Sequence, residues 1–153
     1  MHWADVLADK LAKEKRNHVL ATGITPSGPI HIGNMREILT TDAVYRSLTD
    51  KDIDAELIYV ADDYDPLRKV YPYLPKSYEK YVGKSISEIP CQCGDHKSYA
   101  DHYLTSFLSS LKEIGVKPLV YRASEMYKNG EYKESIQIAL ENVNKIREII
   151  EKI

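Results

Sequence analysis

A short stretch near the amino terminus constrains the fold of this chain more than any other part of it. Residues 18–22 are an apolar run typical of a buried strand, residues 23–31 are rich in glycine and proline, and residues 32–48 have the apolar spacing of a helix. The order strand, tight loop, helix is typical of an open α/β sheet, in which ligands bind beyond the carboxyl ends of the strands. Because the first N–H groups of a helix lack intrahelical partners, such a junction favours an anion, and a nucleotide phosphate is the natural candidate.

The residue types in this loop fit a phosphate site. Glycines that permit close approach and prolines that stiffen the backbone shape the loop, namely Gly23, Pro26, Gly28, Pro29 and Gly33. His31 and Asn34 lie three positions apart, so both side chains can face one ligand from the first helical turn and donate to it. The residues alone leave a second interpretation open, which is a glycine- and proline-rich loop in which His31 caps the helix.

Strands and helices are predicted to alternate along the chain. We expect helices over residues 3–16, 32–48, 98–114, 124–128 and 132–153, a short helix near 77–81, and strands over residues 18–22, 55–60 and 117–121. Ser98 is the predicted cap of its helix, and Gly115 is its left-handed terminator. The first two strands are separated by the length of a βαβ unit, which implies parallel pairing. The predicted fold class is therefore α/β, with a sheet of about three parallel strands flanked by helices.

Apolar stripes indicate the buried faces of the first and last helices. Trp3, Leu7 and Leu11 recur at helical spacing, and we expect the Trp3 end to pack on the sheet. The last helix has an apolar stripe that keeps helical spacing to the end of the chain, and we assign it to core packing: Ile136, Leu140, Val143, Ile146, Ile150 and Ile153. Because no terminator follows this stripe, the alternative is self-association or pairing with a further part of the protein.

Three carboxylates, Asp62, Asp63 and Asp65, directly follow the second predicted strand. Because the carboxyl ends of parallel strands meet at one edge of a sheet, we expect these side chains on the same side as His31. They could bind a substrate ammonium or a metal, or they could cap the next loop. Their spacing alone favours the cap in a solvated loop.

The segment from about residue 62 to residue 97 lacks a sustained period and is punctuated by prolines, so we expect an irregular surface excursion. Within it, Cys91, Cys93 and His96 would provide three of the four ligands of a tetrahedral zinc site. Such sites usually space their cysteines more widely and need a second cluster, so we favour a reduced, structural pair and predict no metal site. His102, in the first turn of the next helix, is interpreted as a surface histidine, with a substrate contact as the less favoured alternative.

Composition excludes several classes of protein. The chain of 153 residues has the size of one domain, and it has no apolar run near the roughly 20 residues of a membrane span. A formal net charge of −2 argues against a dedicated nucleic-acid-binding domain. Only two cysteines and no secretory signal indicate a cytoplasmic protein without a membrane partner.

Residues 22–34, Thr-Gly-Ile-Thr-Pro-Ser-Gly-Pro-Ile-His-Ile-Gly-Asn, closely resemble the signature loop of class I aminoacyl-tRNA synthetases, in the form carried by class I lysyl-tRNA synthetases. Residues 1–5, 62–70 and 98–102 resemble the same family, so the resemblance covers nearly the whole chain. The second signature of the class, a lysine-rich loop of the Lys-Met-Ser-Lys-Ser type, does not occur in this sequence. Residues 1–153 therefore resemble the amino-terminal part of a Rossmann-like catalytic domain, an incomplete nucleotide-binding fold, either as a fragment or as a short relative.

The resemblance implies ATP-dependent activation of lysine to lysyl-adenylate and transfer of lysine to tRNA(Lys), with Mg²⁺ accompanying the nucleotide. On the matching positions, His31 and Asn34 would be catalytic and contact the ATP phosphates in the transition state. The implied ATP-binding residues are Pro26, Ser27, Gly28, His31, Gly33 and Asn34, and the implied lysine-binding residues are Gly23, Thr25, Asp62 and Asp63. Two alternatives stay open: another nucleotidyltransferase with a His-x-Gly-His-like loop, and a non-catalytic nucleotide- or partner-binding module.

Overall fold

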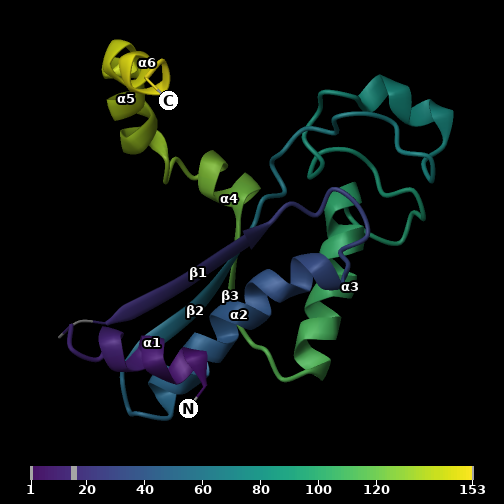
Figure 1. Ribbon diagram of the computed structural model, residues 1–153. Coiled ribbons are helices and arrows are strands. Elements are labelled where there is room, and N and C mark those ends of the chain that lie inside the picture. The colour runs from purple at the N-terminus through teal and green to yellow at the C-terminus, as the bar shows by residue number, and fades with distance from the viewer. Residues whose placement is uncertain (1, 15–16, 153) are drawn as a thin grey trace.

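The computed structural model describes residues 2–14 and 17–152. Parts of three predictions lie outside the described residues: Met1 of the first family-like stretch, residues 15–16 of the first helix, and Ile153 of the last stripe. The elements, in chain order (Figure 1), are α1 (Trp3–Leu11), β1 (His18–Ile24), α2 (Ile32–Thr49), β2 (Ala55–Ala61), the 3₁₀ helix η1 (Lys76–Tyr81), α3 (Tyr99–Glu113), β3 (Leu119–Arg122), α4 (Ala123–Lys128), α5 (Lys133–Glu141) and α6 (Val143–Ile150). None of the helices in the described residues is both long and apolar enough to cross a membrane.

The sheet is parallel, with the strand order β1-β2-β3. The register pairs His18 with Ala55 and Ile24 with Ala61, so β1 and β2 end side by side, and Arg122 ends β3 beside Ala61. This confirms the predicted α/β class and the parallel βαβ unit. It also brings the loop after β1, the acidic segment after β2 and the start of α4 to the same edge of the sheet.

The main core lies between one face of the sheet and the helices α2 and α3. Its buried members are Ile24, Ile38, Leu57, Tyr59, Ala61, Leu104, Phe107, Leu111 and Val116. Three of these residues, Leu104, Phe107 and Leu111, come from α3. Ser98 caps α3 by accepting the Asp101 N–H, and Gly115 ends the segment with a φ of 78°, as predicted. On the other face of the sheet, Val19 and Leu119 are 60% and 50% exposed.

Helix α1 is shorter than predicted and packs mainly on α2. Its buried residues are Ala4 and Ala8, which contact Val44 and Leu48 of α2. Trp3 is 48% exposed, so the prediction that it packs on the sheet is wrong. Alanines have small side chains that let two helices approach closely, and this contact selects the alanine face over the face with the larger apolar residues.

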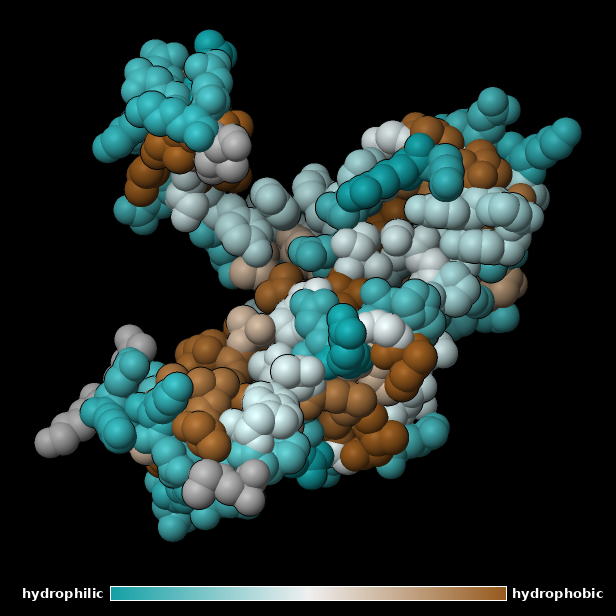
Figure 2. Space-filling model, viewed as in Figure 1, coloured by the Kyte–Doolittle hydropathy of each residue, from teal (hydrophilic) through white to brown (hydrophobic). Residues whose placement is uncertain are grey.

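The predicted helix over residues 132–153 is two helices, α5 and α6, separated at Asn142. The amide of Asn142 donates to the carbonyl of Ile138 at 2.8 Å, and the backbone leaves the helical region there. Neither helix buries any residue, so the assignment of the stripe to core packing is wrong. Both helices project from the sheet in Figure 1, and apolar side chains gather on part of their surface in Figure 2.

The irregular segment has a hydrophobic core of its own, so it is more than a surface excursion. The segment contains η1, which confirms the short helix predicted near 77–81, and it packs against the first turns of α3. The buried residues of this second core are Leu67, Leu74, Tyr78, Ile86, Ile89, Tyr99, Ala100 and Tyr103. The second core holds this segment beside the loop that follows β1.

Candidate functional site

Two adjoining hollows lie at the carboxyl edge of the sheet. One, of about 330 Å³, reaches Gly23, Glu37, Asp65 and Arg68, and we call it the carboxylate hollow. The other, of about 350 Å³, runs along residues 28–31 of the loop after β1, and we call it the loop hollow. The residues that line both are Ile24, Thr25, Ser27, Asn34 and Tyr71. A ligand with two differently charged ends can therefore extend from one hollow into the other.

His31 is the N-cap of α2. Its Nδ1 accepts the Gly33 N–H at 3.1 Å, while the Asn34 Oδ1 accepts the His31 N–H at 3.5 Å. The capping interpretation of His31 is thus confirmed, and it is compatible with ligand binding. Because Nδ1 is an acceptor here, the proton of the neutral ring is on Nε2, which can donate to a ligand. The first turn of α2 has no acidic residue, so the positive end of the helix dipole is not neutralised from within that turn.

Two glycines are required by the side chains next to them. A Cβ at Gly33 would lie 2.9 Å from Cε1 and 3.0 Å from Nδ1 of His31, so a side chain there displaces the ring. A Cβ at Gly28 would lie 2.6 Å from the hydroxyl of Tyr73. Glycine at these positions keeps His31 and Tyr73 in place.

Two tyrosines hold the centre of the loop. The hydroxyl of Tyr99 donates to the carbonyl of Ser27 at 2.7 Å, and the hydroxyl of Tyr73 lies 3.5 Å from the same oxygen. Burial raises the pKa of Tyr99 far above its ordinary value, so the hydroxyl stays protonated and donates at physiological pH. Pro26 is fully buried. These contacts fix the loop before any ligand binds.

The carboxylate hollow is rich in negative charge. The hydroxyl of Thr25 donates to Oδ2 of Asp65 at 3.1 Å, and the exposed Arg68 lies 3.8 Å from that oxygen. Asp62 lies beside Gly23, with its Oδ2 at 3.7 Å from the position of a Gly23 Cβ. Burial, followed by the neighbouring carboxylates of Asp65 and Asp63, raises the pKa of Asp62. A cationic ligand group would relieve this repulsion.

Glu37 is a residue that the sequence analysis missed. It lines the carboxylate hollow together with Asn34, which lies one helical turn before it in α2. The signal was available in the sequence, because position 37 follows Asn34 by three and so shares its face of the helix.

Asp63 has a structural position, in contrast to its predicted role. Its side chain is fully buried, and its oxygens accept from Nε and Nη2 of Arg122 at 2.7 Å and from the N–H and hydroxyl of Ser124 at 2.8 Å. Arg122 also donates to Asp101 at 2.6 Å. Burial alone would raise the pKa of Asp101, but the hydrogen bonds from Arg122 and Ser98 outweigh it and lower the pKa. The structure does not support the predicted contact of Asp63 with lysine, because both of its oxygens are already bonded inside the protein.

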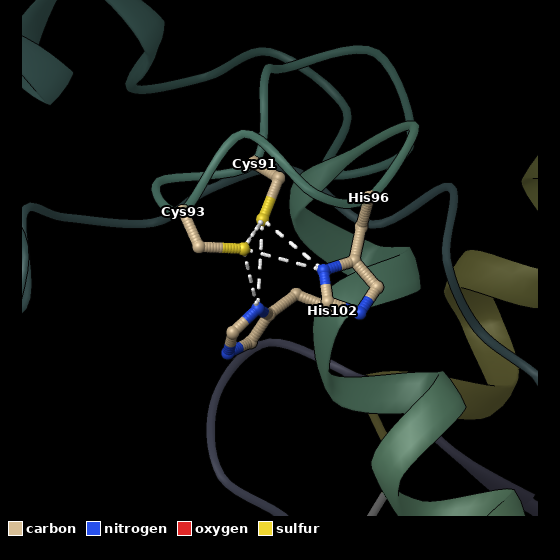
Figure 3. Close-up of side chains that lie close together, drawn as sticks. All are labelled: Cys91, Cys93, His96 and His102. Carbon is tan, nitrogen blue, oxygen red and sulfur yellow. Dashed lines mark hydrogen bonds between the residues drawn. The ribbon is translucent and has the colours of Figure 1, made fainter.

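A second group of reactive side chains lies away from these hollows. Cys91, Cys93 and His96 of the irregular segment meet His102 from the first turn of α3, as Figure 3 shows. His102 is half-buried and contacts both thiols, so its interpretation as a surface histidine is wrong. The fourth residue of a possible metal cluster was therefore present in the sequence, six positions after His96.

The whole chain, residues 1–153, matches the family model described as tRNA synthetases class I (K). It is 58% identical over 153 residues to a lysine–tRNA ligase of Methanosarcina barkeri, covering 100% of this chain and 28% of that protein. It is 55% identical over 154 residues to the lysine–tRNA ligase of Methanocaldococcus jannaschii, covering 99% of this chain and 29% of that protein. For the lysine–tRNA ligase of Archaeoglobus fulgidus the identity is 48%, covering 100% of this chain and 31% of that protein. The chain thus spans less than a third of the length of these curated relatives.

Proposed function

This chain belongs to the tRNA synthetases class I (K) family, and we propose that it supplies the amino-terminal part of the catalytic domain of a cytoplasmic lysine–tRNA ligase. Such an enzyme activates lysine with ATP to give lysyl-adenylate and pyrophosphate, and then transfers lysine to the terminal ribose of tRNA(Lys). The observation that carries the proposal is the pair of adjoining hollows, one beside His31 and one lined by carboxylates. Their opposite electrostatic characters match the two substrates.

On the ATP side, the start of α2 offers donors to negative charge. His31 can donate through Nε2, and Asn34 uses its oxygen for the cap, so its NH₂ group is available to a ligand. These donors would act on the phosphates as charge develops during adenylate formation, with the positive end of the α2 dipole behind them. Mg²⁺ would enter with the phosphates, since it retains several waters and needs few protein ligands.

On the lysine side, the carboxylate hollow would take the ε-ammonium group. Glu37 and Asp65 line it and Asp62 lies beside it, whereas the nearby cation Arg68 is 77% exposed and reaches only 3.8 Å from Asp65. An ammonium group there gains from this excess of negative charge. The lysine carboxylate would then point toward the loop hollow, where it must meet the α-phosphate. Adenylate formation in this arrangement is positioning and charge stabilisation, without a covalent enzyme intermediate.

Lysine-dependent exchange of pyrophosphate into ATP, measured on a complete lysine–tRNA ligase that contains this chain, tests the activation step. We compare the wild-type protein with His31→Asn, because asparagine preserves an N-cap acceptor but removes the imidazole donor. Loss of one such donor typically slows the chemical step by about 100- to 1,000-fold. His2 is the matched control, since it caps α1 by the same type of capping box, and His2→Asn should leave the exchange rate unchanged.

The kinetic pattern decides between a catalytic and a binding role. We expect His31→Asn to lower the turnover number far more than it changes the Michaelis constant for ATP, because the contact strengthens in the transition state. An altered Michaelis constant with an unchanged turnover number would contradict the transition-state role. Calorimetric binding of ATP by the wild-type protein without any lysine-dependent exchange would instead support a non-catalytic module.

Thr25→Val tests the amino-acid side of the site. Valine keeps the size of threonine and removes the hydroxyl that donates to Asp65. We expect lysine binding to weaken by about 0.5 to 1.5 kcal/mol, or roughly 2- to 12-fold, with ATP binding unchanged. Equal losses for both ligands would indicate general damage to the loop.

A further inference from the structure

A positively charged surface lies on the irregular segment, although the whole chain has a formal net charge of −2. Residues 66–90 contain five lysine or arginine residues and only two carboxylates, so the remainder of the chain is more strongly negative than the whole. The five cations are all exposed, and we call them the basic face: Arg68, Lys69, Lys76, Lys80 and Lys84. We propose that the basic face binds the phosphate backbone at the acceptor end of tRNA.

The charges of the basic face are not neutralised by carboxylates. Arg68 approaches Asp65 only to 3.8 Å, and its side chain is 77% exposed. The four lysines form no ion pair with any residue that the structure describes. A solvated surface that serves only solubility usually has both signs of charge interspersed, whereas an excess of one sign attracts a ligand of the opposite sign. The partner of the basic face is therefore expected to be an anion with several charges.

A tyrosine ring positions two of these lysines. The ammonium groups of Lys80 and Lys84 lie 5.0 and 5.8 Å from the centroid of the Tyr81 ring. The Tyr81 ring meets the buried Tyr78 ring edge to face, with centroids 5.4 Å apart, and so rests on the second core. An ammonium group over an aromatic ring keeps its charge and its capacity to donate to phosphate oxygens. Both lysines thus present ordered donors on a packed support.

The basic face is continuous with the two hollows. The Leu67 N–H donates to the carbonyl of Lys84 at 2.9 Å, so the backbone that leads into Arg68 and Lys69 runs beside the backbone of Lys84. The ammonium group of Lys69 lies 5.7 Å from the centroid of the Tyr71 ring, and Tyr71 lines both hollows. Figure 1 shows the irregular segment beyond the end of β1, where the hollows lie. A long anion can therefore extend from the hollows onto the basic face.

Of the three substrates, tRNA fits this surface best, and this step rests on the proposed function. Lysine is a cation at its side chain, which the basic face repels. The phosphates of ATP are assigned to the start of α2 and lie inside the hollows. The terminal ribose of tRNA must reach the hollows to accept lysine, so the phosphates that precede it in the tRNA chain must lie just outside them. Lysine side chains on that path would neutralise these phosphates and release their counterions.

Binding of labelled tRNA(Lys) to a complete lysine–tRNA ligase that contains this chain tests the proposal. Lys80→Gln combined with Lys84→Gln, the glutamine variant, removes two phosphate contacts. The plot of log affinity against log salt concentration should therefore become less steep by about 1.4, and the affinity at about 0.15 M salt should fall about tenfold. Lys80→Arg combined with Lys84→Arg keeps both charges and should keep the wild-type slope. Lys112→Gln combined with Lys117→Gln is the matched control, because it removes two exposed charges near the amino end of β3, and it should bind tRNA as the wild type does.

Pyrophosphate exchange at saturating tRNA separates this proposal from the proposed function. Neither Lys80 nor Lys84 lines the two hollows in the part of the chain that the structure describes, so the glutamine variant should exchange at the wild-type rate. Wild-type affinity and salt dependence in the glutamine variant would overturn the proposal, as would an equal loss of tRNA binding in the matched control. A wild-type protein without lysine-dependent exchange, whose tRNA binding still depends on Lys80 and Lys84, would refute the proposed function alone.

Discussion

Replacing Asp63 with alanine should destabilise the protein far more than removing a carboxylate from its surface. The Asp63 side chain is fully buried, and its two oxygens accept from Arg122 and Ser124 at 2.7 to 2.8 Å. Removal of one partner of a buried ion pair typically costs about 3 to 5 kcal/mol, because the other charge is left uncompensated. Arg122 keeps Asp101 as a partner and is 25% exposed, which favours the low end of that range.

The buried N–H of Ser124 also loses its acceptor, and an unsatisfied buried donor costs about 1 to 3 kcal/mol. Together these effects predict a loss of about 4 kcal/mol in the free energy of unfolding. For a chain of this size that loss corresponds to a fall of about 8 to 16 °C in the melting temperature. Urea denaturation followed by circular dichroism measures the free energy difference.

Asp9→Ala is the matched control, because it removes an exposed carboxylate that pairs with Lys51 at 2.8 Å. Both members of that pair are substantially exposed, so the expected loss is below about 1 kcal/mol. If Asp63→Ala destabilises the protein no more than Asp9→Ala and selectively weakens lysine binding, the structural role assigned to Asp63 is refuted. Asp63 would then return to the lysine site, as the family resemblance implied.

Three further substitutions test other parts of the structure. Gly33→Ala should displace the His31 ring and so lower lysine-dependent pyrophosphate exchange by about 100-fold or more, as loss of the His31 donor does. The free energy of unfolding, measured by urea denaturation, should change by no more than about 1 kcal/mol, because alanine favours the helix. Asp62 has a raised pKa in the folded protein, so its ionisation destabilises the fold as pH rises above its ordinary value of 3.8. Asp62→Asn should therefore raise the melting temperature at pH 7 but not near pH 3, and calorimetry should show that it weakens lysine binding. Equal melting temperatures of the wild-type protein and Asp62→Asn at pH 7 would contradict the charge argument. Leu140 is 70% exposed on the apolar surface of α5 and α6, so Leu140→Glu should reduce self-association in sedimentation velocity, and unchanged association would exclude that surface.

Local signals predicted much of the fold. Ser98 and Gly115 define the ends of their segment through backbone chemistry that depends on neighbouring residues only, and the structure has both as expected. The parallel pairing of β1 with β2 was predicted from the length of the segment between them, because a strand–helix–strand crossover of that length joins parallel strands. His31 and Asn34 lie together because helical spacing alone places them on one turn.

The features that the sequence did not predict depend on contacts between distant residues. Asp63 is buried because Arg122, 59 positions later, comes to the same sheet edge, and no local pattern reports that pairing. His102 joins the two cysteines through the path of a loop without periodic structure. For α1, the two alternative faces were both compatible with helical spacing, and the close contact with α2 selected the face of Ala4 and Ala8. Core packing of the last stripe was inferred from spacing alone, which does not show whether another element covers it.

Trp3, the only tryptophan of the sequence, lies on the exposed side of α1. It lines a hollow of about 570 Å³ whose other side is the first turns of α2, including Ile32, Gly33 and Arg36. The indole is therefore an intrinsic fluorophore next to the helix start that carries His31, although it contacts neither of the two hollows at the sheet edge. Its emission wavelength and quenching by acrylamide would report movements of α1 against α2 without any added label. Twelve tyrosines lie elsewhere in the chain, so selective excitation of Trp3 isolates the signal of this single helix junction.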